Sequence, residues 1–212
     1  MNDVLTEIKK AVIEGNDEAA VRLTEQALKE GLSPSEILDN GLVPGMDVVG
    51  DRMDKGTIFI PEVLLSARAM KASLEILRPL LAKAEAKPMG KVVMGTVKGD
   101  LHDIGKSLVC MMLEGAGFEV IDLGKDVAPE VFVEAVKKEK PDIVGMSALL
   151  TTTMRNMGIT IKALEEAGLR DQVKIMIGGA AVSRDFAEKI GADGYAHSAP
   201  AGVVMAREFI GS

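Results

Sequence analysis

The segment KVVMGTVKGDLHDIGKSLVC, residues 91–110, contains the pattern that decides the fold of the C-terminal part of the chain. Residues Lys91–Val97 form a β-rich run, a loop follows over residues 98–105, and a helical pattern begins directly after it. The same order recurs, with a weak last run, at Phe118–Leu123, Asp142–Met146, Val173–Ile177 and Gly194–Ala196. Strands that alternate with helices predict βαβ units, a parallel sheet and right-handed crossovers.

The N-terminal part, from Asp3 to Ala84, has apolar residues at helical spacing and no convincing strand alternation. The sequence Ser-Pro-x-Glu at residues 33–36 is typical of a helix start, and Pro61 begins another helix. We expect four helices, the third interrupted near Pro44-Gly45 and the fourth kinked or ended by Pro79. Short connections between them predict a four-helix bundle.

The polar segment AEAKPMG, residues 84–90, separates the two patterns. We therefore place a domain boundary there and predict a helical domain over residues 1–88 and an α/β domain over residues 89–212. A single globule of 212 residues buries about 70% of the surface of its extended chain, whereas a unit of half that length buries less. Two such domains would depend on each other or on something bound between them.

The composition excludes several classes of protein. A net charge of −7 and 3% aromatic residues disfavour nucleic-acid binding, which needs a basic surface and, for single strands, stacking side chains. No apolar run approaches the roughly 18 residues of a membrane span, and the start MNDVLTEIKK lacks the pattern of a secretory signal. The single Cys110 cannot form an intramolecular disulfide. We expect a cytoplasmic protein with neither a nucleic-acid nor a membrane partner.

The loop after the first strand places a carboxylate and an imidazole two residues apart, at Asp100 and His102, with Gly105 close behind. Ligands of parallel sheets bind beyond the carboxyl ends of the strands, where this loop lies. Histidine is the commonest metal ligand, and a carboxylate on its other ring nitrogen fixes the tautomer. Two His and one Cys are too few for a zinc or iron site, so a lone His102 suits a metal held by a tetrapyrrole-like ring. The alternative is a surface histidine beside a helix-capping Asp.

Two other loops of the same predicted edge carry hydroxyl groups or glycines. Residues 147–153 offer four hydroxyl groups that cap a helix or line a pocket for a polar cofactor tail. Gly178-Gly179 form a simple turn or permit close approach by a flat or bulky group. His197, at the end of the last strand, is interpreted as a polar residue at the rim.

The string GDLHDIGK at residues 99–106, followed by Ser147-x-Leu149 and Gly178-Gly179, resembles the cobalamin-binding domain shared by methionine synthase and the corrinoid methyl-carrier proteins of anaerobic methyltransferase systems. The helical part is similar to the cap domain of that family at residues 46–50, 59–63 and 66–71. The resemblance covers nearly the whole chain. It implies a four-helix-bundle cap and a Rossmann-like, flavodoxin-like parallel-sheet domain that binds cobalamin or a related corrinoid, base-off/His-on.

The resemblance also implies roles for individual residues. His102 would be the lower axial ligand of cobalt, Asp100 would accept a hydrogen bond from its other ring nitrogen, and Thr153 would continue this relay. Methyl transfer would make and break the His102–cobalt bond, so the relay would couple the cobalt state to protonation. Met53 and Ile60 would shield the upper face of the cofactor, or else belong to the bundle core. The tail of the cofactor would enter a deep channel lined by Gly105, Ser147, Leu149, Thr151, Gly178 and Gly179. Asp103 is a further expected cofactor contact.

The resemblance implies a methyl carrier that is not a complete enzyme by itself. A substrate-specific methyltransferase would load the cobalt, a second would pass the methyl group to a folate or thiol acceptor, and a reductive activation protein would be a further partner. Residues 148–154 and 167–174 look most like methylamine-type carriers, which favours a methylamine or quaternary amine over methanol or aryl methyl ethers.

Two alternatives come from other functional classes. The small subunit of an adenosylcobalamin-dependent mutase shares Asp-x-His-x-x-Gly, but such subunits generally lack the helical cap that residues 1–84 resemble. A cobalamin-dependent sensor or regulator would need an output module, and the sequence shows none.

Overall fold

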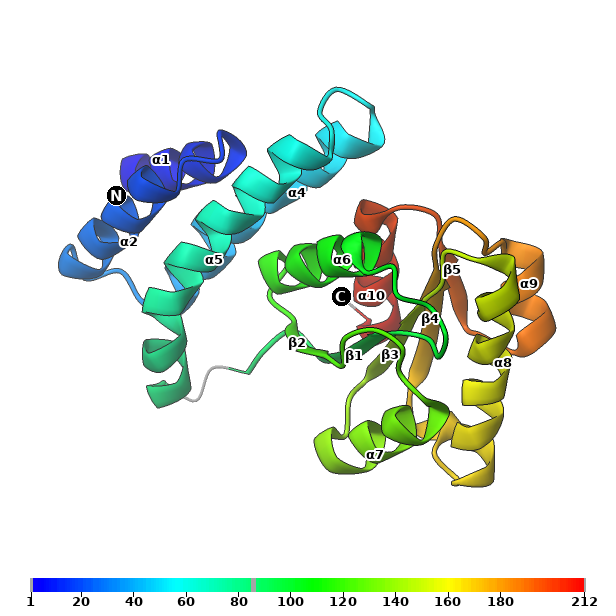
Figure 1. The fold of residues 1–212 in the computed structure, drawn as a ribbon. Coiled ribbons are helices and arrows are strands. Elements are labelled where there is room, and N and C mark those ends of the chain that lie inside the picture. The colour runs from blue at the N-terminus through cyan, green and yellow to red at the C-terminus, as the bar shows by residue number, and fades with distance from the viewer. Residues whose placement is uncertain (1, 85–86, 212) are drawn as a thin grey trace. The chain divides into compact units, whose positions relative to one another are not determined.

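The computed structural model describes residues 2–84 and 87–211. The chain divides into two compact units, one of residues 1–88 and 114–117 and the other of residues 89–113 and 118–212. Figure 1 shows helices in the first, the helical unit, and a sheet flanked by helices in the second, the sheet unit. The assignment of residues 114–117 to the helical unit is not predictable from the change of pattern at residues 84–90.

The helical unit follows the predicted order with one irregular turn. Its elements are α1 (Asn2–Ile13), α2 (Asp17–Lys29), α3 (Pro34–Ile37), the π-helical turn η1 (Leu38–Leu42), α4 (Val43–Asp54) and α5 (Ile60–Lys83). The predicted interruption near Pro44 is this turn, which ends just before the proline. A proline ring crowds the carbonyl group four residues earlier, here that of Asn40, and a wider turn relieves the crowding.

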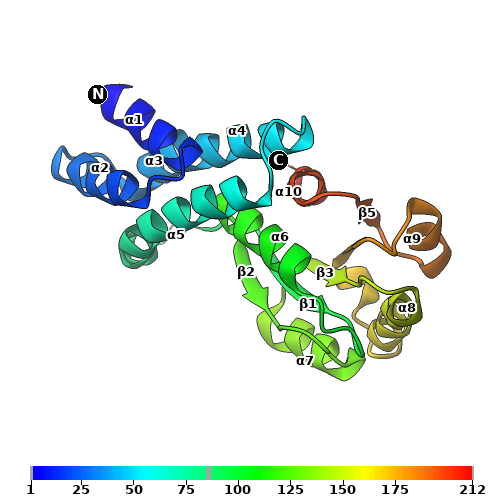
Figure 2. The same cartoon turned by 45° about the horizontal axis from the view of Figure 1, so that its top comes forward.

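A capping box and a proline explain the start of α3 and the bend of α5. The Ser33 hydroxyl accepts the Glu36 N–H at 3.2 Å, and the Glu36 carboxylate accepts the Ser33 N–H at 2.9 Å, which completes the capping box at the start of α3. Pro79 does not end α5, which runs on to Lys83. Figures 1 and 2 show instead that α5 changes direction in its C-terminal turns, so of the two predicted outcomes the kink is the one observed.

The turn between α1 and α2 packs closely on α5 through Gly15. This glycine has a φ of +67°, and a Cβ added to it would lie 2.6 Å from the Leu65 Cβ and 3.1 Å from the Leu65 carbonyl carbon. The position therefore excludes a side chain for two reasons, backbone conformation and contact with another helix. Among residues 2–84 and 87–211, no helix has the length and apolar character that a membrane crossing requires.

The sheet unit contains the predicted parallel sheet, in the strand order β2-β1-β3-β4-β5. The strands are β1 (Lys91–Thr96), β2 (Glu119–Asp122), β3 (Ile143–Ser147), β4 (Lys174–Gly178) and β5 (Gly194–Ala196). The helical elements are α6 (Ile104–Gly115), α7 (Pro129–Glu139), α8 (Thr151–Glu166), the 3₁₀ turn η2 (Arg170–Gln172), α9 (Arg184–Ile190) and α10 (Ala199–Ile210). The strand order reverses between β1 and β3, the point where ligands of this topology bind.

Helices cover both faces of the sheet, so the central strands are buried. Figures 1 and 2 show α6 and α10 over one face and α7 and α8 over the other. On the α7 and α8 side, Phe132 and Met157 pack with Val93 and Ile175 of the strands in one core cluster. Two-sided burial explains why these strands appear as continuous apolar runs without polar alternation.

We predict that Gly15→Ala lowers the free energy of unfolding by about 2–4 kcal/mol, because it adds left-handed strain to a clash with α5. Gly31→Ala is the matched control, since Gly31 has a φ of +90° but a Cβ there would meet no atom within 4 Å. Gly31→Ala should lower the free energy of unfolding by only about 1 kcal/mol. Urea unfolding followed by circular dichroism measures both, and equal losses would contradict the packing role of Gly15.

Candidate functional site

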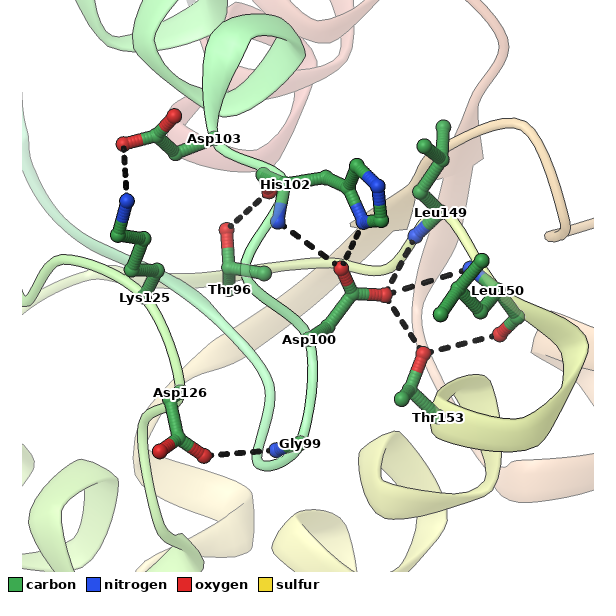
Figure 3. Close-up of polar contacts among 10 residues, drawn as sticks. All are labelled: Thr96, Gly99, Asp100, His102, Asp103, Lys125, Asp126, Leu149, Leu150 and Thr153. Carbon is green, nitrogen blue, oxygen red and sulfur yellow. Dashed lines mark hydrogen bonds and ion pairs between the residues drawn. The ribbon is translucent and has the colours of Figure 1, made fainter.

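The buried carboxylate of Asp100 is the centre of the site (Figure 3). Its Oδ1 accepts the backbone N–H of His102 at 3.1 Å and lies 2.7 Å from His102 Nδ1. Its Oδ2 accepts the Thr153 hydroxyl at 2.6 Å and the backbone N–H groups of Leu149 and Leu150 at 2.9 and 3.3 Å. Five donors thus surround one carboxylate group.

The strand order brings these donors together. Asp100 and His102 follow β1, whereas Leu149 and Leu150 lie between β3 and α8, and Thr153 lies in the first turn of α8. Because β1 and β3 are neighbours in the sheet, the loops after their carboxyl ends meet at the point of strand reversal. The positive end of the α8 dipole also favours a negative charge at this place.

Burial and hydrogen bonding oppose each other at Asp100. Burial raises the pKa of this carboxyl group, but the hydrogen bonds from the side chains of Thr153 and His102 and from the backbone of His102 and Leu149 outweigh it. The pKa therefore lies well below the ordinary value of 3.8, and Asp100 is ionised at neutral pH. An ionised carboxylate can only accept, so Nδ1 of His102 carries the hydrogen, and in the neutral ring Nε2 is then the nitrogen with the free lone pair.

The surroundings of His102 suit a flat apolar ligand. The His102 side chain is 52% exposed, although its Asp100 partner is fully buried. Large apolar side chains are exposed on the same loops and at the start of α6, namely Leu101, Ile104, Leu149 and Leu150. Exposed apolar groups that cluster in this way mark a binding surface.

A cavity of about 300 Å³ in the sheet unit adjoins the carboxyl ends of the strands. Four of the predicted channel residues line it, namely Gly105, Ser147, Gly178 and Gly179. Gly179 has a φ of +120°, and a Cβ there would lie 2.0 Å from the Ala148 carbonyl oxygen, so no other residue fits without a shift of the backbone. A Cβ on Gly105 would meet no atom within 4 Å, which shows open space beside this glycine.

Three predicted contact residues do not line the cavity. Leu149 supplies its backbone N–H to Asp100, and its side chain is exposed. Thr151 is exposed at the start of α8. Asp103 forms an ion pair of 4.0 Å with Lys125 (Figure 3). Leu149 and Thr151 thus do not line this cavity, and their contact with the tail of a cofactor stays a prediction.

Several residues of the cavity wall were not predicted as site residues. They include Met94 on β1, Met176 on β4, and the buried Lys106, whose ammonium group pairs with Asp122. Lys106 directly follows Gly105 in the motif, and this position could have predicted Lys106 as a residue of the cavity wall. No local signal distinguishes the methionines from other core residues. His197, predicted at the rim, lines the cavity and is exposed.

Met53 and Ile60 lie in the helical unit, where the α4–α5 connection forms a second cavity of about 350 Å³. Its wall also contains Phe59, which is 68% exposed. Ile60 is 42% exposed and Met53 is half-buried, so neither belongs to the buried core of the bundle. Of the two alternatives for these residues, membership of the bundle core is therefore wrong.

The metal-ligating side chains of this site suit a metal that is already held by a macrocycle and needs only one protein ligand. Across residues 2–84 and 87–211, no three His, Cys, Asp or Glu side chains are grouped so that they could hold a metal ion. His102 instead offers a single oriented imidazole nitrogen, the kind of axial ligand that a macrocycle-bound metal takes. The carboxylate of Asp100 lies beside Nδ1 of this ring, and a carboxylate there is the usual partner of a metal-binding histidine.

Comparison with known families agrees with this geometry. Residues 90–204 match a family model described as a B12 binding domain, and residues 4–78 match a second model with the same description. The chain belongs to the B12-binding corrinoid proteins. Both units of this corrinoid protein are thus members of B12-binding families, which confirms the predicted fold class and cofactor class.

Relatives of this corrinoid protein share nearly its whole length. Trimethylamine corrinoid protein 2 of Methanosarcina acetivorans is 49% identical over 93% of this chain and 92% of its own. Dimethylamine corrinoid protein 1 of the same organism is 46% identical over 98% of both chains. The crystal structure of the methanol:cobalamin methyltransferase complex from Methanosarcina barkeri contains a similar chain, with a TM-score of 0.87, 35% identity, and coverage of 99% of this chain and 80% of that one.

We predict that Thr153→Val, which removes the hydroxyl group but keeps the branched shape, lowers the free energy of unfolding by about 1–2 kcal/mol at neutral pH. The folded pKa of Asp100 lies below 3.8, so its ionised form contributes stability above that pH, and the contribution is lost as the pH falls toward the folded pKa. The variant raises the folded pKa, so its deficit should stay constant at neutral pH and shrink only below pH 3.8, as the pH falls through the folded pKa values.

Urea unfolding at a series of pH values measures this deficit. Thr153→Ser keeps the donor and should keep most of the pH-dependent stability. A deficit of Thr153→Val that stays constant even as the pH falls well below 3.8 would show that the hydroxyl group has no effect on the charge of Asp100.

Proposed function

We propose that this corrinoid protein carries a methyl group on the cobalt of its cofactor between two methyltransferases, with Nε2 of His102 as the lower ligand of the metal. One observation carries the proposal: the buried, ionised Asp100 lies 2.7 Å from Nδ1 of His102 and leaves Nε2 free to bind a metal. When bound, the corrinoid supplies the cobalt centre that accepts and releases the methyl group.

The chain's own residues orient the ligand and hold a proton. The Thr153 hydroxyl donates to Asp100, and Asp100 in turn fixes the His102 ring in one tautomer. A metal and a proton compete for the same Nε2 lone pair, because only the unprotonated nitrogen binds a metal. The hydrogen bond between Nδ1 and Asp100 leaves Nε2 as the nitrogen at which this competition would take place. The relay thereby couples ligation to protonation.

We assign the cavity of the sheet unit to the nucleotide tail of the corrinoid. Gly105 leaves open space there, and Gly178 and Gly179 keep side chains out of the wall. We further propose that Met53 and Ile60 shield the upper face of the cofactor, since both line an apolar cavity and neither lies in the bundle core.

The names of the relatives support the choice of methyl donor and partners. Two relatives over 45% identical are trimethylamine and dimethylamine corrinoid proteins, so we propose a methylamine as the donor and a methylamine-specific methyltransferase as the first partner. The similar chain in the methanol:cobalamin methyltransferase complex supports a methyltransferase partner of this kind. We propose a second methyltransferase with a folate or thiol acceptor, a reductive activation protein, and a cytoplasmic location.

We predict that His102→Gly loses the axial nitrogen ligand of cobalt. Wild-type protein loaded with hydroxocobalamin should show a base-off, His-on absorption spectrum, whereas the variant should show a shifted spectrum or no bound cofactor. Added imidazole should restore the wild-type spectrum in the variant, because it replaces the missing ring. A variant spectrum identical to wild type without imidazole would rule out the ligand assignment.

We also predict selectivity for the methyl donor. The reduced, cobalamin-loaded protein is mixed in turn with purified trimethylamine-, dimethylamine- and methanol-specific methyltransferases, each with its substrate, and methylation of the cofactor is followed by absorbance. The methylamine-specific enzymes should methylate it at least about tenfold faster than the methanol-specific one, the ratio given by a difference of about 1.4 kcal/mol in barrier. Preferential reaction with the methanol enzyme would contradict the proposed donor.

A further inference from the structure

The turn that carries Asp100 is held by a residue from another loop. The Gly99 N–H donates to Oδ1 of Asp126 at 2.8 Å, and the Asp126 N–H donates to the carbonyl oxygen of Asp100 at 3.0 Å. These two hydrogen bonds join the same pair of loops in opposite directions (Figure 3 draws the first). The turn between Val97 and Asp100 is therefore clamped from the segment that follows β2.

The clamping segment is itself anchored to the central strand. The Thr96 N–H donates to the Gly124 carbonyl oxygen at 2.9 Å, and the Val127 N–H donates to the Thr96 carbonyl oxygen at 2.9 Å. Val97 and Val127 form an isolated parallel bridge. Asp126 thus lies on a short extension of the sheet beside β1, so its carboxylate has a fixed position relative to the motif loop.

The backbone at Asp126 adopts a conformation that few residues tolerate. Asp126 has a φ of +56°, and within residues 2–84 and 87–211 only Lys140, at +48°, shares a positive φ without being glycine. Asp and Asn are enriched at such positions, but glycine fits them with the least strain. Unlike glycine, Asp126 supplies a side-chain acceptor at this position, for the Gly99 N–H.

The Asp126 side chain is a charged hydrogen-bond acceptor for the Gly99 N–H. Its Oδ1 also lies 3.3 Å from the Lys98 ammonium group. The Gly99 N–H and the Lys98 ammonium lower the pKa of Asp126 by more than its partial burial raises it, so the group is a carboxylate at neutral pH. A charge-assisted hydrogen bond to a backbone N–H is stronger than a neutral one.

We infer that Asp126 is a positioning residue for the cobalt ligand: by holding Gly99 and Asp100, it fixes the direction in which Asp100 presents His102. The inference rests on the proposed role of His102 as that ligand. Asp126 is not among the residues that line the cavity, and its hydrogen bonds with Gly99 and Asp100 place its effect in the turn.

The test compares variants that distinguish the effect of losing the Asp126 side chain from the effect of relieving its backbone strain. Asp126→Gly relieves the positive φ and removes the acceptor, whereas Asp126→Asn tolerates this φ and keeps an oxygen acceptor for Gly99. Lys140→Gly is the matched control, because it relieves the same kind of strain at the end of α7, before β3 and away from the motif loop. If Asp126→Gly does not fold, the pair Asp126→Ala and Lys140→Ala takes its place with the same expectation.

The readout is the axial nitrogen seen by cobalt. Protein labelled with ¹⁵N-histidine is loaded with hydroxocobalamin, reduced by one electron and measured by electron paramagnetic resonance, where an axial ¹⁵N splits each cobalt line into a doublet. Asp126→Gly should show a His-on to His-off ratio, or an affinity for hydroxocobalamin, about three- to tenfold lower than wild type, the factor expected for the loss of one hydrogen bond. Asp126→Asn and Lys140→Gly should remain within about twofold of wild type.

Each outcome decides one question. A doublet in wild type with no loss in Asp126→Gly overturns the positioning role and leaves the proposed function intact. Equal losses in Asp126→Gly and Lys140→Gly overturn it too, because they show a general effect of glycine. A wild-type signal without ¹⁵N splitting overturns the proposed ligand and, with it, the role of Asp126. A loss in Asp126→Gly that Asp126→Asn rescues supports the inference.

Discussion

The fold of the sheet unit is organised around one buried negative charge, that of Asp100. A carboxylate removed from water remains ionised only if other groups replace its hydration, and here five donors do so. Four of them are backbone or hydroxyl groups, and the fifth is the imidazole of His102. The cost of burying the charge therefore keeps the histidine in one tautomer with one free nitrogen.

The rest of the site follows from where that charge lies. The reversal of strand order between β1 and β3 is the place where two loops can supply donors to one carboxylate without crossing the sheet. The same edge holds the glycines of the cavity wall, where the backbone of one loop passes the Ala148 carbonyl oxygen too closely for a side chain on Gly179. The reversal of strand order thus provides both the Asp100–His102 pair for the metal and the cavity for a bulky ligand.

The sequence predicted the elements well because their signals are local. The capping box at residues 33–36 and the β-rich runs of the sheet unit each depend on neighbours within a few residues. Prediction was less complete where contacts are distant. The backbone N–H of Leu149 reaches Asp100 across 49 residues, whereas its side chain was expected to line a channel. The cavity wall also includes Met94 and Met176, which resemble any other buried methionine in the sequence.

The sequence alone determined the division into helical and βα patterns, the motif loop with His102, and the chemical type of ligand that a lone histidine suits. Residue types and their periodicity carry that information locally. Only the tertiary structure decided which donors surround Asp100, that Asp126 clamps its turn, and that Ile60 is exposed outside the bundle core. These relations depend on strand order and packing between segments far apart in the chain, and no local pattern contains them.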